Sequence, residues 1–274
     1  MVDEAEPGVR QNPATAARIY DYLLGGAHNY PADRELAQTV IASFPLAQAG
    51  IRANRAFLRR SVRHLGTSGV RQFLDIGSGI PTAGNVHEIA QAIVPDARVV
   101  YVDIDPVAVA ESLSILDGNA NATAIRADLL EPESILDHPM VRGLLDFREP
   151  VALLLVALLH FVADDTKAYA AVNRLLGALP PGSYLVISHV TDQDQDFSQD
   201  GVKDVEDAYR RRAATTGRLR SRSEIARFFE GAELVDPGLV WVPQWRPEPG
   251  EPDEPEFATD PRLSMTLAGV GRLP

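Results

Sequence analysis

Apolar residues recur with two different spacings along the chain, and the change comes near residue 70. In the first part they stand three or four positions apart, which is the spacing of one face of an α-helix. The helices predicted from this spacing cover residues 14–24, 31–44 and 49–65. Gly25-Gly26 marks the end of the first helix, because glycine readily ends helices. No strand pattern occurs in this part, so we expect residues 1–69 to form a helical cap.

Beyond residue 70, short apolar runs rich in β-branched residues alternate with helical spacings. Strands are expected at residues 71–76, 98–103, 123–126, 151–157 and 183–189. Helices are expected at residues 84–94, 106–116 and 165–179. The run at 151–157 is almost wholly apolar, as in a central strand that is buried on both faces. Strands separated by helices of this length form βαβ units, so the sequence predicts an α/β fold with a mostly parallel, doubly wound sheet.

The C-terminal part of the chain is more polar, and its pattern is less regular. We expect a loop at 192–204, helices at 205–215 and 223–229, and strands at 234–242 and 263–270. Ser221 and Glu224 stand three residues apart, which predicts a capping box at the start of the second of these helices. The stretch 247–255 is rich in Pro and Glu and predicts an exposed loop. Residues 70–274 are therefore expected to form one domain.

The composition limits both the size of the fold and the kind of partner. The chain has 274 residues, of which 45% are hydrophobic, enough for one large domain with a full core. It has no cysteine, which excludes disulfides, thiolate zinc sites and iron–sulfur clusters. The formal net charge is -12, and this charge opposes contact with nucleic acid. A small-molecule or peptide substrate is favoured.

The sequence also gives an expectation about the cellular location. The longest apolar run, residues 151–159, is too short to cross a bilayer. The N-terminus is acidic and has no apolar stretch typical of a signal peptide. We therefore expect a cytoplasmic protein without a membrane partner, either a monomer or a homodimer.

A glycine-rich turn, Asp75-Ile76-Gly77-Ser78-Gly79, follows the first predicted strand. Glycines in such a turn let the backbone approach a bound ligand closely, although they also suit a plain β–α turn. Asp103 ends the second predicted strand, 24 residues after Gly79. A carboxylate at that place in a doubly wound fold accepts hydrogen bonds from a ribose. The turn and Asp103 together favour a nucleoside ligand.

Two features disfavour a dinucleotide as that ligand. Thr82 stands where the third glycine of G-x-G-x-x-G belongs, and the carboxylate of Asp75 would repel a pyrophosphate. The turn also lacks the G-K-[ST] sequence of a phosphate-binding P-loop. Asp75 suits a ligand with positively charged groups. Asp128, after the third predicted strand, is placed to accept a hydrogen bond from an adenine amino group, with Leu129 against the ring.

Three segments stand in order along the domain: DIGSG at residues 75–79, VDIDP at 102–106 and ADL at 127–129. They resemble the successive cofactor motifs of class I S-adenosylmethionine-dependent methyltransferases. Three further stretches resemble one bacterial family provisionally assigned as such methyltransferases, whose substrates are mostly unassigned. These are PATAARIYDYLLGG at residues 13–26, NRAFL at 54–58 and VALLHFV at 156–162. The resemblance covers nearly the whole chain and implies a seven-stranded sheet with an antiparallel last strand, an N-terminal helical cap and S-adenosylmethionine as cofactor.

The resemblance also implies roles for single residues. Asp75, Gly77, Ser78 and Gly79 would flank the methionyl amino group, Asp103 and Ile104 the ribose, and Asp128 and Leu129 the adenine. Arg55 either pairs with the carboxylate of the cofactor or lies on an exposed helix face. Asp105 matches a position that is often a small polar residue, so its role stays open.

His160 follows the apolar strand and should emerge at the carboxyl end of the sheet, where open α/β folds bind their ligands. It could act as a general base, orient the acceptor, or pack against the following helix. Positioning of the reactants supplies much of the catalysis of methyl transfer. A general base helps only when the acceptor must lose a proton. His189 ends the fifth predicted strand, and packing is the simpler interpretation there.

The segment at residues 20–30 gathers polar and aromatic side chains around Gly25-Gly26. We expect a lid that hinges at the two glycines and lines the acceptor pocket, with Asn54 beside it. Its candidate residues are Tyr20, Tyr22, His28, Asn29 and Tyr30. The alternative is a helix packed on the core, with glycines that only end it.

No metal site is expected. Asp192, Asp194 and Asp196 alternate as in a calcium-binding loop, but Phe197 and Lys203 stand where that loop needs glycine and glutamate.

The sequence therefore predicts methyl transfer from S-adenosylmethionine to a small-molecule acceptor, at oxygen or nitrogen. Two alternatives use the same fold: an enzyme that binds the cofactor but catalyses another step of secondary metabolism, and a non-catalytic nucleoside-binding regulator. The fold does not separate them. The fate of the cofactor does, because only methyl transfer yields S-adenosylhomocysteine in step with a methylated product.

Overall fold

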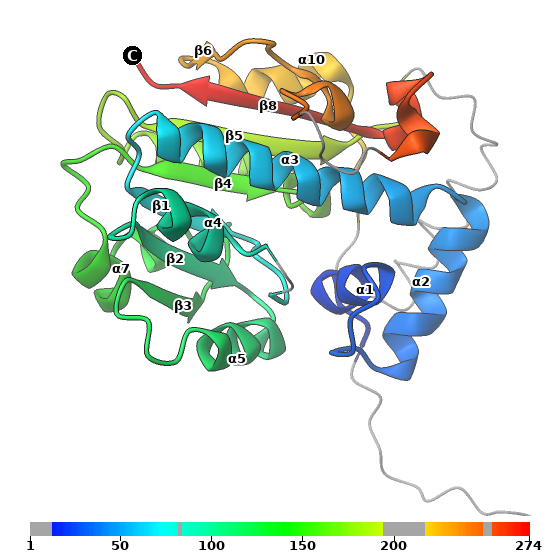
Figure 1. Ribbon diagram of the computed structural model, residues 1–274, viewed down its shortest axis with the longest axis horizontal. Helices are drawn as coiled ribbons and strands as arrows, with labels where there is room; N and C mark the ends of the chain where they lie inside the picture. Colours follow the sequence, from blue (N-terminus) through cyan, green and yellow to red (C-terminus); the bar gives the residue numbers. More distant parts are fainter. Residues whose placement is uncertain (1–12, 82–83, 194–216, 249–253) are drawn as a thin grey trace, which may run out of the picture.

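A mostly parallel β-sheet forms the centre of the protein in the computed structural model (Figure 1). The structure describes residues 13–81, 84–193, 217–248 and 254–274. The strand order is β3-β2-β1-β4-β5-β8-β6, and β7 pairs with β8. Neighbours from β3 to β5 pair in parallel, whereas β8 runs antiparallel to β5. The predicted α/β fold with an antiparallel last strand is confirmed.

The strands begin and end close to their predicted positions. The parallel strands are β1 (Gln72–Ile76), β2 (Arg98–Asp103), β3 (Ala122–Arg126), β4 (Ala152–Val156) and β5 (Tyr184–Val190). The strands that pair antiparallel are β6 (Glu233–Leu234), β7 (Val240–Trp241) and β8 (Thr266–Arg272). Alternate residues of each central strand enter two different hydrophobic clusters: Phe73 of β1 lies in one and Leu74 in the other. Both faces of the sheet are therefore buried, which explains the continuous apolar run of β4.

The sheet has eight strands, one more than the seven expected from the sequence. The strand predicted at 234–242 is divided into β6 and β7, which both pair with β8. Pro237 lies between them and has no N–H to donate to a neighbouring strand. Gly238 has a φ angle of 87°, which turns the chain. These two residues prevent one continuous strand.

Helices cover both faces of the sheet. The first cluster is covered by α3 (Ala47–Thr67) and α4 (Val86–Ile93), and α5 (Pro106–Ile115) packs beside β3. The second cluster is covered by α6 (Pro132–Leu136), α7 (Pro139–Leu144), α8 (Asp165–Leu176) and the segment after α10 (Arg222–Ala226). The sequence did not predict α6 and α7, because helices this short contain too few turns for a periodic apolar pattern.

The helices before β1 have two different relations to the sheet. Helices α1 (Ala16–Leu23) and α2 (Pro31–Ser43) enclose a small hydrophobic cluster of their own. Helix α3 instead lies over the sheet and runs along β4 and β5 (Figure 1), and it buries Phe57 and Leu65 in the first cluster. The buried Arg60 of α3 donates to the carbonyl oxygens of Val242 and Trp245, each at 2.7 Å. The division at residue 69 stays a prediction, but α3 shares its core with the sheet.

Some predicted elements lie outside the described residues: the helix at 205–215, most of the loop at 192–204 and the middle of the loop at 247–255. The capping box of Ser221 and Glu224 is present at the start of α10. None of the described helices is long and apolar enough to cross a membrane.

Because Leu65 is fully buried between α3 and the sheet, we expect Leu65→Ala to lower the free energy of unfolding by about 2–5 kcal/mol. The control is Leu113→Ala, at a leucine of α5 that is 45% exposed, and it should cost less than about 0.5 kcal/mol. Urea denaturation measures both values. Equal effects of the two substitutions would contradict a shared core of α3 and the sheet.

Candidate functional site

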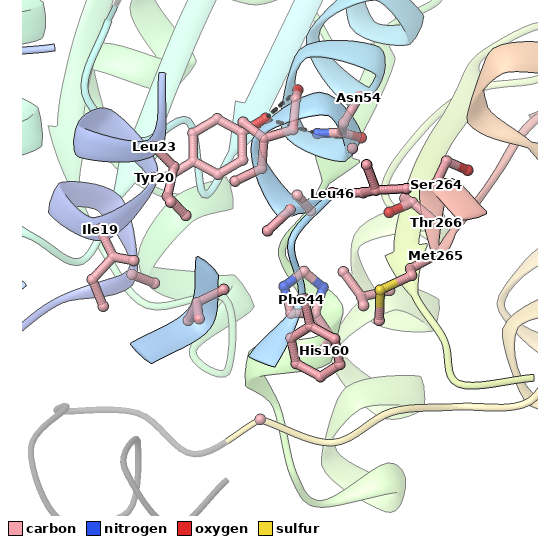
Figure 2. Close-up of a pocket in the computed structure, with 18 of the residues that line it drawn as sticks. Ile19, Tyr20, Leu23, Phe44, Leu46, Asn54, His160, Ser264, Met265 and Thr266 are labelled. Atoms are coloured by element: carbon pink, nitrogen blue, oxygen red, sulfur yellow. Dashed lines mark hydrogen bonds between the residues drawn. The ribbon is translucent and has the colours of Figure 1, made fainter. Parts of the chain in front are cut away.

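Two cavities lie next to each other at the carboxyl ends of the parallel strands. The larger, which we name the strand-end cavity, has a volume of about 460 Å³ and is lined by residues that follow β1, β2, β3 and β4. The smaller, the cap cavity, has a volume of about 230 Å³ and is lined by residues of α1, α2 and α3 and by 263–266 (Figure 2). Five residues line both: Ala16, Tyr20, Asn54, Ala157 and Phe161. The two cavities therefore lie directly beside each other.

Asp103 ends β2 and is 8% exposed at the strand-end cavity. Its carboxylate accepts hydrogen bonds from the backbone N–H of Gly79 at 2.7 Å and of Asp105 at 2.8 Å. Burial raises the pKa of Asp103, and the N–H donors offset part of that rise. The two bonds fix the carboxylate between the glycine turn and the loop before α5. This geometry is compatible with the predicted role in holding a ribose.

Asp75 lies near the end of β1 and is 5% exposed at the same cavity. Burial raises the pKa of its carboxyl to about 7, although the guanidinium of Arg55 lowers it. Arg55 also lines the cavity and donates to the carbonyl oxygen of Gly84 at 3.4 Å. A buried acid that titrates near neutral pH is ready to lose its proton when a cation binds beside it.

Gly77 and Gly79 have φ angles of 73° and 67°, which side-chain-bearing residues rarely adopt. A Cβ atom on Gly77 would lie 2.5 Å from Cδ1 of Leu158, so the turn packs directly against the loop after β4. Ser78 lines the cavity between the two glycines. Thr82, the residue in the place of the third glycine, lies outside the described residues.

Apolar side chains form the wall of the strand-end cavity beyond Asp103. Ile104 is 54% exposed and Leu130 is 39% exposed, and both line the cavity. Exposed apolar side chains at a cavity suit the faces of a flat ligand. Leu129, the predicted ring contact, also lines the cavity but is mostly buried in the second cluster. Asp128 accepts the backbone N–H of Leu130 at 2.9 Å, which fixes the position of this second leucine.

The cap cavity is mainly apolar. Its apolar lining includes Ile19, Leu23, Val40, Phe44 and Met265. Its polar side chains in the described part of the chain are those of Tyr20, Asn54, His160, Ser264 and Thr266. No described lysine, arginine, aspartate or glutamate lines it. Such a cavity favours an uncharged ligand, because a charge without a partner is costly to bury.

A chain of hydrogen bonds runs along the wall between the cavities. Ser188 accepts the backbone N–H of Ala157 at 2.9 Å and donates to Asn54 at 2.6 Å. Asn54 donates to the hydroxyl of Tyr20 at 3.0 Å, and that hydroxyl lies 3.4 Å from the carbonyl oxygen of Ile51 (Figure 2). Burial raises the pKa of Tyr20, so its hydroxyl stays neutral. Tyr20 is thus held as a neutral hydroxyl in the wall between the cavities.

Ala157 follows β4 and has a φ angle of 54°, in the left-handed region that disfavours side chains. Its backbone N–H is held by both the carbonyl oxygen and the hydroxyl of Ser188. Strained backbone of this kind is often found at ligand sites. Here it turns the chain from β4 toward His160 at the point where the two cavities meet.

His160 lies in a short 3₁₀ helix, Leu159–Phe161, and lines the cap cavity. Its Nδ1 is buried without a hydrogen-bond partner among the described residues. Burial and the nearby guanidinium of Arg220 lower its pKa to about 3. The imidazole is therefore neutral at pH 7 and a weak base, which favours an orienting role over that of a general base.

His189 and Arg220 hold His160 in place through a ring contact and through hydrogen bonds to the neighbouring backbone. The rings of His160 and His189 lie edge to face, 5.5 Å apart. His189 is fully buried, and burial lowers its pKa. The fully buried Arg220 contacts Nε2 of His189 at 3.0 Å and donates to the Leu159 carbonyl oxygen at 2.7 Å. The sequence analysis missed Arg220, because its partners come from distant segments.

The structure places only one of the predicted lid residues at the cavities, namely Tyr20. The other four, Tyr22, His28, Asn29 and Tyr30, line neither cavity. Asn29 donates to the carboxylate of Asp21 at 2.9 Å, within the turn between α1 and α2. A Cβ atom on Gly26 would overlap that carboxylate, so the second glycine is needed for the packing of this turn. Hinge motion at the glycines stays a prediction.

The comparisons with known proteins point to one family. A family model described as S-adenosyl methyltransferase matches residues 3–274. The chain is 42% identical to a DUF574 family protein of known structure from Streptomyces avermitilis, with a TM-score of 0.88, over 96% of this chain and 98% of that one. It is 39% identical to a protein from Thermobifida fusca whose structure is provisionally assigned to a methyltransferase, with a TM-score of 0.87, over 99% of both chains.

A more distant structure supports the fold alone. An O-methyltransferase family protein from Burkholderia thailandensis is 16% identical, with a TM-score of 0.51, over 88% of this chain and 59% of that one. Among curated proteins, none matches the chain.

The low pKa of His160 gives a prediction about stability. Between about pH 3 and pH 6.5 the unfolded chain binds a proton at this residue that the folded protein does not, so His160 makes stability rise with pH in this window. We expect His160→Gln to flatten that rise in the free energy of unfolding, measured by urea denaturation at several pH values. His28→Gln, at an exposed histidine, controls for the substitution itself. Parallel curves for the wild type and His160→Gln would contradict the burial of a neutral imidazole.

Proposed function

The chain belongs to the S-adenosyl methyltransferase family, and on that premise we propose that it methylates a small, uncharged and largely apolar acceptor at an oxygen or nitrogen atom. The protein is an S-adenosylmethionine-dependent methyltransferase with a class I α/β fold. The observation that carries the acceptor proposal is the apolar cap cavity, which shares a wall with the strand-end cavity.

We assign the cofactor to the strand-end cavity. Its residues fit the chemical parts of S-adenosylmethionine in the order in which they stand along the strand ends. In this proposal Asp75 faces the amino group and Asp103 the ribose, while Ile104 and Leu130 enclose the adenine. Arg55, at the same cavity, is the candidate partner of the carboxylate of the cofactor. The fit rests on the two glycines with positive φ, the buried acids and the exposed apolar wall.

When bound, S-adenosylmethionine would supply a sulfonium methyl group, and its transfer to a neutral O–H or N–H acceptor would leave S-adenosylhomocysteine and release one proton. In this proposal the protein contributes position and exclusion of water more than proton transfer. In this proposal the methyl group passes between the two cavities beside Tyr20, Asn54 and Ala157, which line both of them. Helix α1 covers both cavities there and keeps water away from the transfer.

The charges around the cap cavity support an uncharged acceptor. An ionised acceptor would find no described residue of opposite charge on its wall. A protonated amine would also be repelled by the guanidinium of Arg220, which already lowers the pKa of His160. We assign to His160 a hydrogen bond that orients the acceptor. With a net charge of -12 the chain is not suited to nucleic acid, which supports a small molecule.

The proposed function is tested by the fate of the cofactor. Purified protein is incubated with S-adenosylmethionine and a panel of neutral hydroxylated and aminated aromatic compounds. Equal amounts of S-adenosylhomocysteine and methylated product, from a neutral acceptor only, would support the proposal. Transfer to charged acceptors in preference to their neutral analogues would contradict it.

The pKa of Asp75 predicts how cofactor affinity depends on pH. A protonated carboxyl must lose its proton to pair with the amino group of the cofactor, so the Kd for S-adenosylmethionine should fall as pH rises toward about 7. Below that pH each unit changes the Kd by up to about tenfold, and binding releases a proton. Calorimetry in two buffers of different ionisation enthalpy measures both effects. Asp75→Asn should remove the proton release, and an unchanged release in this variant would rule out Asp75 as its source.

The two-cavity assignment predicts that the acceptor site can be blocked without loss of cofactor binding. Val40 lines only the cap cavity and is half-buried, so Val40→Trp should fill the cavity. We expect methyl transfer to fall by about a hundredfold or more, since misplacement of a reactant by 1 Å already costs that much. The Kd for S-adenosylmethionine should stay within about twofold of the wild type, because no cofactor contact is changed. Gln38→Trp, at an exposed residue of the same helix, is the matched control. Full transfer activity in Val40→Trp would exclude the cap cavity as the acceptor site.

A further inference from the structure

Helix α1 forms part of the wall of both cavities. Thr15, at its N-cap, and Arg18 line the strand-end cavity, whereas Ile19 and Leu23 line the cap cavity. The apolar cluster that α1 forms with α2 is separate from the two clusters of the sheet. The attachment of α1 to the strand ends therefore depends to a large extent on polar side chains.

Arg18 makes the central polar attachment. Its guanidinium contacts Asp33 of α2 at 2.9 Å and Asp105 at 3.1 Å, and it donates to the carbonyl oxygen of Pro13 at 2.5 Å. All three charged residues are buried: Arg18 is 3% exposed, Asp33 0% and Asp105 5%. The rigid fork of an arginine suits several directed bonds at once, which a lysine cannot match.

Asp105 connects this ion pair to the cofactor site. It stands two residues after Asp103, and its backbone N–H donates to the carboxylate of Asp103 at 2.8 Å. One of its carboxylate oxygens caps α5 through the N–H of Val107 at 2.9 Å. The other accepts from Arg18 and from the hydroxyl of Thr15, at 3.1 Å and 2.5 Å. Asp105 thus contacts α1 through its side chain and the proposed ribose-binding carboxylate through its backbone.

We propose that Arg18 is a positioning residue that couples binding of the cofactor at Asp103 to the placement of α1 over the acceptor cavity. A ligand held by Asp103 restrains the loop that also carries Asp105, and the buried ion pair passes this restraint to α1. The acceptor cavity is then complete only when the cofactor site is filled, so the cofactor binds before the acceptor. The coupling rests on the proposed cofactor site, and its significance for the acceptor rests also on the proposed acceptor site.

Hydrogen–deuterium exchange with S-adenosylhomocysteine as the only ligand tests the coupling. In the wild type, the ligand should slow amide exchange in residues 16–23 by about fivefold or more, the lower range of coupling between two sites. The ratio of the exchange rates of α1 without and with ligand should fall below about twofold in Arg18→Met, while the ligand still protects residues 75–79. Arg18→Lys should restore part of the ratio, because it keeps the charge but not the fork.

The ratio of exchange with and without ligand separates coupling from a purely structural role. If Arg18→Met speeds the exchange of α1 equally in both states, or leaves it unchanged, the inference is wrong. Arg34→Met is the matched control: this exposed arginine of α2 bonds to Asn29 and should keep the wild-type ratio. If Arg18→Met does not fold, Asp105→Asn, which keeps the shape of the side chain and removes its charge, serves for the same measurement.

The experiment needs no acceptor, so an error in the proposed acceptor site leaves its outcome unchanged. Absence of ligand protection at residues 75–79 in the wild type would instead overturn the assignment of the cofactor site, and the inference with it. Protection at residues 75–79 without protection of α1 would overturn the inference alone.

Discussion

Parallel pairing of β1 with β2 and β4 is the constraint on which both cavities depend. Parallel strands that follow one another through helices all end at the same edge of the sheet, so loops distant in sequence meet there. Asp75 and Asp103 reach this edge from neighbouring strands, and both are buried. Burial raises the pKa of each carboxyl, and the charge of Asp103 raises that of Asp75 further. Hydrogen bonds from the backbone N–H groups of Gly79 and Asp105 offset part of the rise in the pKa of Asp103. A cationic ligand would offset the remaining free-energy cost of ionising the two carboxyl groups.

The helices before β1 cover this edge of the sheet and form walls of both the strand-end cavity and the cap cavity. Asn54 of α3 reaches Ser188 of β5 on one side and Tyr20 of α1 on the other, so one polar chain spans the sheet, the long helix and the covering helix. Because every hydroxyl and amide in it has a partner, the wall has little freedom to rearrange. The position at which methyl donor and acceptor would meet is therefore set by groups that do not react.

Much of this arrangement could be predicted from the sequence, and the reasons are physical. Strands buried on both faces give continuous apolar runs, and acids at strand ends keep a fixed order along the chain, so β4, Asp75 and Asp103 could be located. The division of the strand at 234–242 follows from Pro237, a signal that was present in the sequence.

Contacts between distant segments could not be predicted. Arg18 and Asp105 are 87 positions apart, and no local pattern indicates that they meet. The same holds for Arg220 and His189, which lie 31 positions apart. Leu129 and Leu130 both line the cavity, and only the course of the loop decides that Leu130 is the more exposed of the two. The sequence thus predicted the acids of the proposed cofactor site better than it predicted the groups that support them.

The hydrogen bonds between α3 and the C-terminal segment determine which parts of the chain must be kept together. Arg60 is buried and bonded to the carbonyl oxygens of Val242 and Trp245, while Asn54 and Arg55, which precede it on the same helix, line the strand-end cavity. Helix α3 and the end of the chain therefore hold each other in place against the sheet. A fragment that ended before residue 242 would keep Asn54 and Arg55 but would lose the two carbonyl groups to which Arg60 is bonded. The wall of the two cavities thus depends on residues that lie near opposite ends of the chain.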